Sequence, residues 1–115
     1  MRILLNKGEI YLAKLNPTKG SELSKVRPVI IFQSPYLKNL PTVIVIPLTT
    51  HIKEDWFPLR VRISKKGKLE KDSDAVIEQL RAIDVSRIVG EPLAIVSKEE
   101  MELLEEAVLY VLGIK

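Results

Sequence analysis

Few side chains in this sequence suit the common catalytic mechanisms. The chain has no cysteine and one histidine, His51, which excludes cysteine nucleophiles, thiolate metal sites and any mechanism that needs two histidines. Asp72 and Asp74 offer a close carboxylate spacing, but they open a predicted strand, where acidic residues at a turn are ordinary. Gly8 and Gly20 stand alone, so no glycine-rich phosphate-binding loop is predicted. We therefore expect neither a metal ion nor a cofactor.

Arginine and threonine remain, and they suit a reaction on RNA. RNA brings its own nucleophile, the 2′-hydroxyl, so the protein needs a cation and hydrogen-bond donors for the phosphorane, and a group that moves protons. Arg27 stands where a long polar segment enters an apolar run, and its planar guanidinium matches a phosphate. Thr49 ends another apolar run. Taken alone, each of these residues favours a structural interpretation. Arg27 suits a surface salt bridge, and Thr49 suits a structural position at the end of a strand. His51 suits an exposed loop position, with an acid–base role as the alternative.

The elements that must position these residues are mostly strands. Runs of β-branched and aromatic residues, or alternation of apolar with charged residues, predict them. So many short strands indicate a small barrel or two packed sheets. Apolar and charged residues alternate in the segment Phe57–Ile63. Leu59, Val61 and Ile63 are expected on one face of this strand, and Arg60 and Arg62 on the other. The predicted strands are Glu9–Leu15, Val29–Phe32, Thr42–Ile46, Phe57–Ile63 and Asp74–Leu80, with 81–84 continuing or bending the last.

A single amphipathic helix is predicted at the C-terminal end. Ser97 with Glu100 three residues later forms a capping box, and apolar residues follow at helical spacing up to Gly113, a typical stop. The glutamates of its first turns suit the positive end of the helix dipole. We expect these glutamates to form a solvated face.

Charge is divided unevenly along the chain. Residues 1–68 carry 13 Lys and Arg against 4 Asp and Glu, a balance of +9, whereas residues 69–115 carry 5 against 11, a balance of −6. Such a split is typical of a surface that binds a polyanion such as RNA, or of basic loops that face an acidic helix. Four lysines in the predicted loops are candidates for holding RNA: Lys19, Lys53, Lys65 and Lys66.

Length and composition predict one globular domain over residues 1–115. The chain is 46% hydrophobic and 29% charged, which is ordinary for a folded domain. No apolar run approaches the roughly 20 residues of a membrane span, and the first residues lack the apolar region of a signal peptide. A cytoplasmic protein without a membrane partner is expected.

Six short segments spread over about two thirds of the chain carry a family resemblance. They are Gly8–Tyr11, Leu15–Glu22, Val26–Gln33, Pro41–Thr49, Lys71–Ser73 and Glu78–Asp84. In this order and spacing they resemble the MazF/PemK family of toxin ribonucleases. One such segment would be weak evidence, but six in register are strong.

The resemblance implies a mainly β (α+β) fold: a compact SH3-like barrel of about five to seven strands with a C-terminal helix, acting as a homodimer. It also implies metal-independent, sequence-selective cleavage of single-stranded mRNA, with 2′,3′-cyclic phosphate and 5′-hydroxyl ends, and a cognate antitoxin that blocks the RNA groove. The family's catalytic arginine and threonine fall on Arg27 and Thr49. Substrate-binding positions fall on Lys19, Gly20, Ser21, Glu22, Thr50, Glu78 and Gln79.

Several segments depart from the family pattern. Ser34-Pro35 follows Gln33 where Asn-Asp is common, and Pro47 stands where small residues are common. Residues 50–58, with Trp56 and Phe57, match poorly; base-reading residues lie in such loops, and aromatic rings there can stack on unpaired bases. Two alternatives remain: a toxin similar to CcdB that shares the barrel but traps DNA gyrase, and a homologue that binds RNA or antitoxin without cutting.

Overall fold

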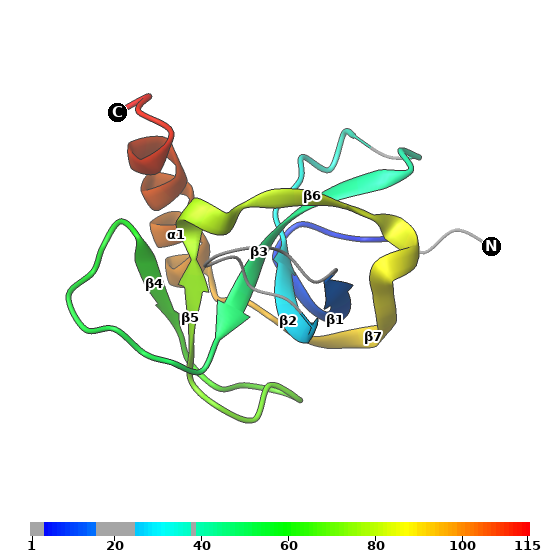
Figure 1. Cartoon of the computed structure of the whole chain (residues 1–115), viewed down its shortest axis with the longest axis horizontal. Coiled ribbons are helices and arrows are strands. Elements are labelled where there is room, and N and C mark those ends of the chain that lie inside the picture. The colour runs from blue at the N-terminus through cyan, green and yellow to red at the C-terminus, as the bar shows by residue number, and fades with distance from the viewer. Residues whose placement is uncertain (1–3, 16–24, 38) are drawn as a thin grey trace.

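The computed structural model describes residues 4–15, 25–37 and 39–115 of the chain. Within them, seven strands are followed by one α-helix, and the short 3-10 turns η1 (Ile77–Gln79) and η2 (Val85–Arg87) flank the sixth strand (Figure 1). The helix is α1 (Lys98–Val111). The strands are β1 (Glu9–Leu15), β2 (Lys25–Ile31), β3 (Thr42–Thr49), β4 (Arg60–Ile63), β5 (Ser73–Val76), β6 (Arg81–Asp84) and β7 (Ile88–Ile95).

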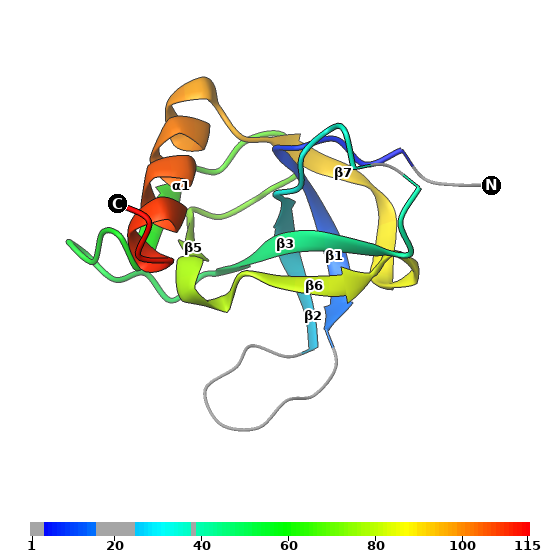
Figure 2. The same ribbon diagram turned by 90° about the horizontal axis from the view of Figure 1, so that it is seen from above.

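The strands pair antiparallel in one sheet in the order β4-β5-β3-β2-β1-β7, and β6 pairs with β3 beside β5. Figure 2 shows β3 and β6 running side by side, with α1 at one end of the molecule. This arrangement confirms the predicted fold class, mainly β with a C-terminal helix. The expected barrel is corrected in one respect: among the described residues, the hydrogen-bonded path ends at β4 and β7 and does not close.

Strand boundaries agree with prediction where the local pattern is strong. The first predicted strand matches β1 at both ends, whereas β3 continues through Pro47 to Thr49. The strand predicted over Phe57–Ile63 begins only at Arg60, because the N–H groups of Leu59 and Arg60 both donate to the Trp56 carbonyl and close a turn. Leu59 therefore lies outside β4 and is exposed, and the prediction that it shares a strand face with Val61 and Ile63 is wrong.

The predicted strand Asp74–Leu80 is wrong after Val76, where the chain enters η1, and β7 was not predicted. The η1 turn carries the chain from β5 to β6, so that two short strands pair with successive parts of β3. The middle of β7 contains Gly90 and Pro92, which are typical of turns, and its residues are largely exposed. Its place in the sheet comes from pairing with β1 rather than from its own pattern.

Two apolar clusters lie on opposite faces of the sheet. Ile30, Ile46 and Leu48 pack with Leu104 and Ala107 of α1, and all five are buried. The alternate residues of the same strands point the other way, into a second cluster. The continuous apolar runs of β2 and β3 are therefore buried on both faces. The second cluster consists of Tyr11, Ala13, Leu15, Val29, Ile31, Val43, Val45, Ile83 and Ile88.

Helix α1 begins with the predicted capping box. The Ser97 hydroxyl accepts from the Glu100 N–H at 3.0 Å, and the Glu100 carboxylate accepts from the Ser97 N–H at 2.8 Å. The prediction that the glutamates form a solvated face is wrong for Glu100, which is buried. Its carboxylate also accepts from the Ser64 N–H at 2.9 Å and is ion-paired with Lys66 at 2.9 Å. This residue joins the helix to the loop after β4.

No helix in the described part of the chain is long and apolar enough to cross a membrane.

Substitution of Glu100 by alanine is expected to lower the free energy of unfolding by about 1–3 kcal/mol, because the Ser97 and Ser64 N–H groups lose their acceptor. Urea titration followed by circular dichroism measures the change. Glu102→Ala, an exposed position of the same helix, is the control and should shift the free energy by less than about 0.5 kcal/mol. Equal effects of the two substitutions would contradict the assigned role.

The same residue predicts a pH dependence. Burial alone raises the pKa of Glu100, but hydrogen bonds from Ser97, Lys66 and Ser64 outweigh it, so the pKa lies below its ordinary value. A carboxyl with a lowered folded-state pKa stabilises the fold above its unfolded pKa, and this contribution is lost as the pH falls through the folded pKa. Unfolding free energy should therefore fall below about pH 4. In Glu100→Gln, measured by the same urea titrations, this fall should be smaller.

Candidate active site

A row of polar side chains crosses four neighbouring strands. Strands β2 and β3 are paired up to Val29 and Pro47, and the same register continued by two residues sets Arg27 across from Thr49. Thr49 pairs with Asp74 of β5, and Asp74 pairs with Arg62 of β4. Directly opposed residues of an antiparallel sheet point to the same face. Arg27, Thr49, Asp74 and Arg62, here called the polar row, therefore share one face.

The adjacent row shows why these positions are distinctive. Leu48 pairs with Ala75, and Ala75 pairs with Val61, and all three are buried in the cluster beneath α1. The row formed by Leu48, Ala75 and Val61 is thus wholly apolar. The polar row, one residue further along each strand, carries charged groups and a hydroxyl. The alternation of Arg60 and Arg62 with Val61 and Ile63 belongs to the same pattern.

Prolines lie where the polar row begins. Pro28 and Pro47 carry no N–H, so neither can donate to a ladder between β2 and β3. The pairing of these two strands ends at the Val29–Pro47 pair, two residues before Arg27 and Thr49. The guanidinium and the hydroxyl thus lie on adjacent strands, beyond the last paired residues.

The Thr49 hydroxyl has a defined orientation. Its oxygen accepts a hydrogen bond from the His51 N–H at 3.2 Å, and the residue is 5% exposed. A hydroxyl that accepts through a lone pair retains its hydrogen for donation. Thr50 and His51, the next two residues, are exposed. The end of β3 thus combines a held hydroxyl with an accessible turn.

A buried carboxylate organises the far end of the polar row. Asp74 is 1% exposed and is ion-paired with Arg62 at 2.8 Å and with Arg60 at 3.3 Å. It also accepts from the Lys53 N–H at 2.8 Å. The guanidinium of Arg62 is held further by Glu54, which contributes to raising its pKa, although the Asp74 hydrogen bond contributes most. Asp74 therefore ties the segment after Thr49 to strands β4 and β5.

Sequence reasoning did not assign a function to Asp74, Arg60 or Arg62. The sequence pattern indicates an ordinary acidic residue at a turn for Asp74 and the polar face of a strand for the two arginines. The alternation of arginines along a strand with a buried face was the available signal, but the strand that supplies their partner could not be known. In the described ranges, no group of three or more His, Asp or Glu that could hold a metal ion gathers.

The other predicted site residues fall into two groups. Glu78 and Gln79 lie in η1, and Glu78 is exposed. The η1 turn connects β5, which pairs with β3 at Leu48, to β6, which pairs with β3 at Val45. They therefore border β3 on the edge away from Arg27. Lys19, Gly20, Ser21 and Glu22 lie outside the described residues.

The basic loop lysines differ in their surroundings. The ammonium group of Lys66 is ion-paired with Glu100 inside the fold, so this candidate for holding RNA has an internal partner. Lys65 is exposed, and its backbone N–H donates to the Asp72 carboxylate at 2.7 Å. Lys53 lies over the Trp56 ring, with its Nζ 5.2 Å from the ring centroid.

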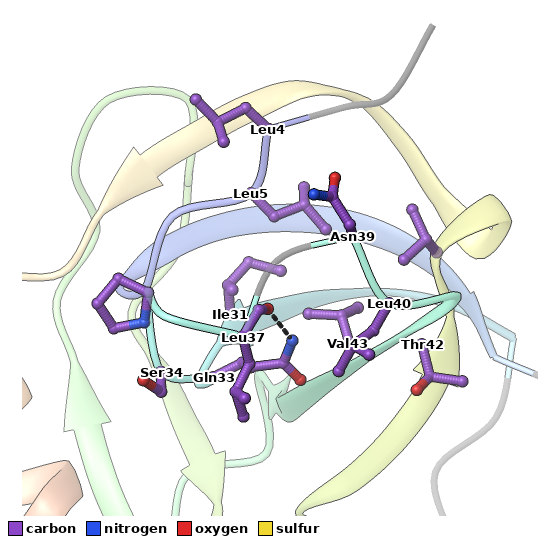
Figure 3. Close-up of a pocket in the computed structure, with 12 residues that line it drawn as sticks. Leu4, Leu5, Ile31, Gln33, Ser34, Leu37, Asn39, Leu40, Thr42 and Val43 are labelled. Atoms are coloured by element: carbon purple, nitrogen blue, oxygen red, sulfur yellow. Dashed lines mark hydrogen bonds between the residues drawn. The ribbon is translucent and has the colours of Figure 1, made fainter.

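A separate apolar pocket of about 190 Å³ lies at the opposite end of the same strands (Figure 3). Leu5, Leu37 and Val43 line it, and Gln33 is fixed at its edge by donating to the Leu37 carbonyl at 2.9 Å. Ile31, which also lines it, is four residues along β2 from Arg27, or about 13 Å. Among the described residues, its lining includes no acid or base.

Solved structures with the same arrangement define the class of protein. The fold matches that of MazF (Form-I) from Deinococcus radiodurans with a TM-score of 0.78 and 17% identity, covering 97% of this chain and 99% of that one. It also matches Mycobacterium tuberculosis toxin MazF-mt6 with a TM-score of 0.73 and 22% identity, covering 91% and 96%. At these identities the likeness establishes the fold, that of MazF toxins.

Sequence comparison establishes the family. Residues 6–112 match the profile of the PemK-like, MazF-like toxin of type II toxin–antitoxin systems. Endoribonuclease MazF of Staphylococcus saprophyticus is 39% identical over 113 residues, covering 96% of this chain and 93% of that protein. The chain belongs to the MazF/PemK toxin family, as the resemblance predicted.

Replacement of Asp74 by asparagine is expected to destabilise the protein by about 3–5 kcal/mol, because Arg60 and Arg62 lose a buried counter-charge. Urea unfolding measures the change. The matched control is Glu70→Gln, which removes the same charge from an exposed position before β5 and should stay within about 0.5 kcal/mol of the parent. An Asp74→Asn protein as stable as this control would show that the ion pairs do not hold the segment.

Proposed function

We propose that this protein is a sequence-selective, metal-independent endoribonuclease toxin that cuts single-stranded mRNA. The observation that supports this proposal is that β2, which contains Arg27, pairs with β3, which contains Thr49, in a register that two further residues would bring to these positions. The two residues are 22 positions apart in sequence, and the family pattern points to the same pair that the chemistry suggests on weaker grounds. Membership of a family that includes the endoribonuclease of Staphylococcus saprophyticus supports the reaction class.

The reaction is a transesterification within the RNA. The 2′-oxygen attacks the adjacent phosphorus, the P–O2′ bond forms and the P–O5′ bond breaks. The products are a 2′,3′-cyclic phosphate and a 5′-hydroxyl, so one proton leaves the 2′-hydroxyl and one reaches the departing 5′-oxygen. Arg27 stabilises the extra negative charge of the phosphorane, and the Thr49 hydrogen orients the phosphate. Because a guanidinium keeps its positive charge in proteins, Arg27 serves mainly as the cation.

Substrate contacts extend from both sides of this pair. Thr50, exposed beside Thr49, and the η1 residues Glu78 and Gln79 border β3 and are proposed to bind RNA. Lys19, Gly20, Ser21 and Glu22 complete the proposed set on the family pattern. No cofactor is required by this chemistry, because RNA supplies the nucleophile.

A cognate antitoxin and a second copy of the chain are the proposed protein partners. Solved structures of similar fold include MazE-MazF (Form-II) from Deinococcus radiodurans, with a TM-score of 0.73, 17% identity and coverage of 99% of this chain and 100% of that one. The excess of +9 over residues 1–68 suits an acidic antitoxin segment that competes with RNA. Action on mRNA places the proposed site of function in the cytoplasm.

Loss of the Arg27 guanidinium is expected to reduce the rate of RNA cleavage about 100- to 1,000-fold, because the phosphorane loses its charge partner. Thr49→Val, which keeps the side-chain shape but removes the hydroxyl, is expected to reduce the rate by a similar factor. Cleavage of a labelled single-stranded RNA in EDTA measures both. The 5′ ends of the fragments should accept phosphate from a kinase without prior phosphatase treatment.

Three controls sharpen the test. Arg27→Lys keeps the charge without the bidentate geometry and should recover only part of the rate. Thr49→Ser keeps the hydroxyl and should recover most of it. Lys98→Ala, an exposed change on α1, should leave it unchanged. Full activity of Arg27→Ala, or complete loss of wild-type cleavage in EDTA, would overturn the mechanism, and inhibition of DNA gyrase with RNA left intact would favour the CcdB-like alternative.

A further inference from the structure

A second hollow of the surface adjoins the polar row. Its volume is about 360 Å³, and its lining includes Lys53, Trp56, Arg60, Arg62 and Asp74, with Leu103 of α1 at the edge. The lining also includes Phe57 and the carboxylates of Glu54 and Asp55, so two aromatic rings, three cations and three carboxylates meet in one place. Asp74 and Glu54 are ion-paired with the two arginines. Among the described residues, the pocket at the opposite end of β2 and β3 is lined by no charged side chain.

The hollow is built on rigid groups. Asp74 holds Arg60, Arg62 and the Lys53 N–H, and Arg60 also donates to the His51 carbonyl at 3.0 Å. The Trp56 carbonyl accepts from the N–H groups of Leu59 at 2.7 Å and Arg60 at 3.2 Å. The backbone at Trp56 is therefore fixed to the start of β4, and its ring is presented from an anchored turn.

The indole itself remains half exposed. Trp56 is 47% exposed, and its ring centroid lies 5.6 Å from the Arg60 guanidinium and 5.2 Å from the Lys53 ammonium. Its neighbour Phe57 differs, because that ring packs edge-on against Tyr110 of α1 at 6.1 Å. Of the two aromatic residues in this turn, one contacts the helix and the other faces cations.

An accessible aromatic ring beside positive charge is the usual composition of a subsite for single-stranded nucleic acid, where a base stacks on the ring and phosphates lie near the cations. We propose that Trp56, with Lys53 and Arg60, binds one unpaired base of the RNA next to the cleavage site. The inference rests on the proposed function and names a residue that would contribute to sequence selection. Arg60 supports the ring, while Lys53, which is exposed, neutralises an adjoining phosphate.

Position along the RNA follows from the polar row. Asp74 pairs directly with Thr49 in the sheet, and the same carboxylate holds Arg60 against Trp56. One fully buried residue thus separates the proposed catalytic hydroxyl from the stacking platform. RNA whose scissile phosphate lies at Arg27 and Thr49 would therefore reach Trp56 with a flanking nucleotide.

The single tryptophan of the sequence provides a direct readout. A random-sequence pool of 2′-O-methyl RNA, which cannot be cut because its nucleophile is blocked, is titrated into the protein while Trp56 emission is recorded. We expect saturable quenching as a base stacks on the indole. Trp56→Leu, which keeps apolar bulk without the stacking surface, should weaken binding of the labelled pool roughly 5- to 150-fold, and Trp56→Phe should recover part of it.

Abasic scanning then locates the base. Each position of a cleavable RNA is replaced in turn by an abasic nucleotide, and kcat/KM is measured. One position should be sensitive in the wild type and insensitive in Trp56→Leu. Tyr36→Leu, which changes a 93% exposed aromatic residue between β2 and β3, is the control and should leave both binding and the scan unchanged. Urea unfolding of each variant establishes that it is folded.

The outcomes separate this inference from the proposed function. Quenching by the pool without any RNA cleavage would refute the nuclease and retain the subsite. Cleavage with no quenching, and with identical scans for wild type and Trp56→Leu, would overturn the subsite alone. A change in sedimentation of Trp56→Leu with unaltered RNA binding would assign the ring to a protein contact instead and would likewise overturn it.

Discussion

Hydrogen bonding of strand β3 to β2 along one edge and to β5 and β6 along the other is the constraint on which the arrangement of this protein depends. The side-chain period of a strand is two, so a slip of one residue would exchange the two faces of β3. Thr49 would then point toward the cluster beneath α1, and Leu48 would point into the polar row. The two apolar clusters prevent that slip, because each needs its own alternate set of residues.

Charge is the second organising feature, and two buried carboxylates connect the basic and acidic parts of the chain. Asp74 and Glu100 both come from the acidic part, residues 69–115, and their ionic partners Arg60, Arg62 and Lys66 come from the basic part. Part of the excess positive charge is thus neutralised internally, at the two ends of β4. The uneven charge along the chain is compatible either with a polyanion-binding surface or with basic loops that face an acidic helix. The ion pair of Lys66 with Glu100 shows that a basic loop faces the acidic helix at this point.

Local patterns predicted the elements whose stability is local. The bounds of β1 and the start of α1 agree with the sequence, since alternation and a capping box involve residues within a few positions of each other. The sequence also sufficed for the family, because six separate segments recur in order. The predictions failed where the structure of a segment depends on a partner far away in the sequence. Strand β7 depends on its pairing with β1, and Glu100 is buried because the loop after β4 contacts it.

By itself, the sequence determined the fold class and the family, and it suggested Arg27 and Thr49 as the proposed reactive pair, because these depend on residue types and short spacings. Only the tertiary structure decided that the pair lies on adjacent strands, that Asp74 continues its row, and that Trp56 faces cations while Phe57 contacts α1. Trp56 lies within four positions of Lys53 and Arg60, but the other relations join residues 22 to 53 positions apart. They are set by strand register and helix packing, which are properties of the whole chain rather than of any segment.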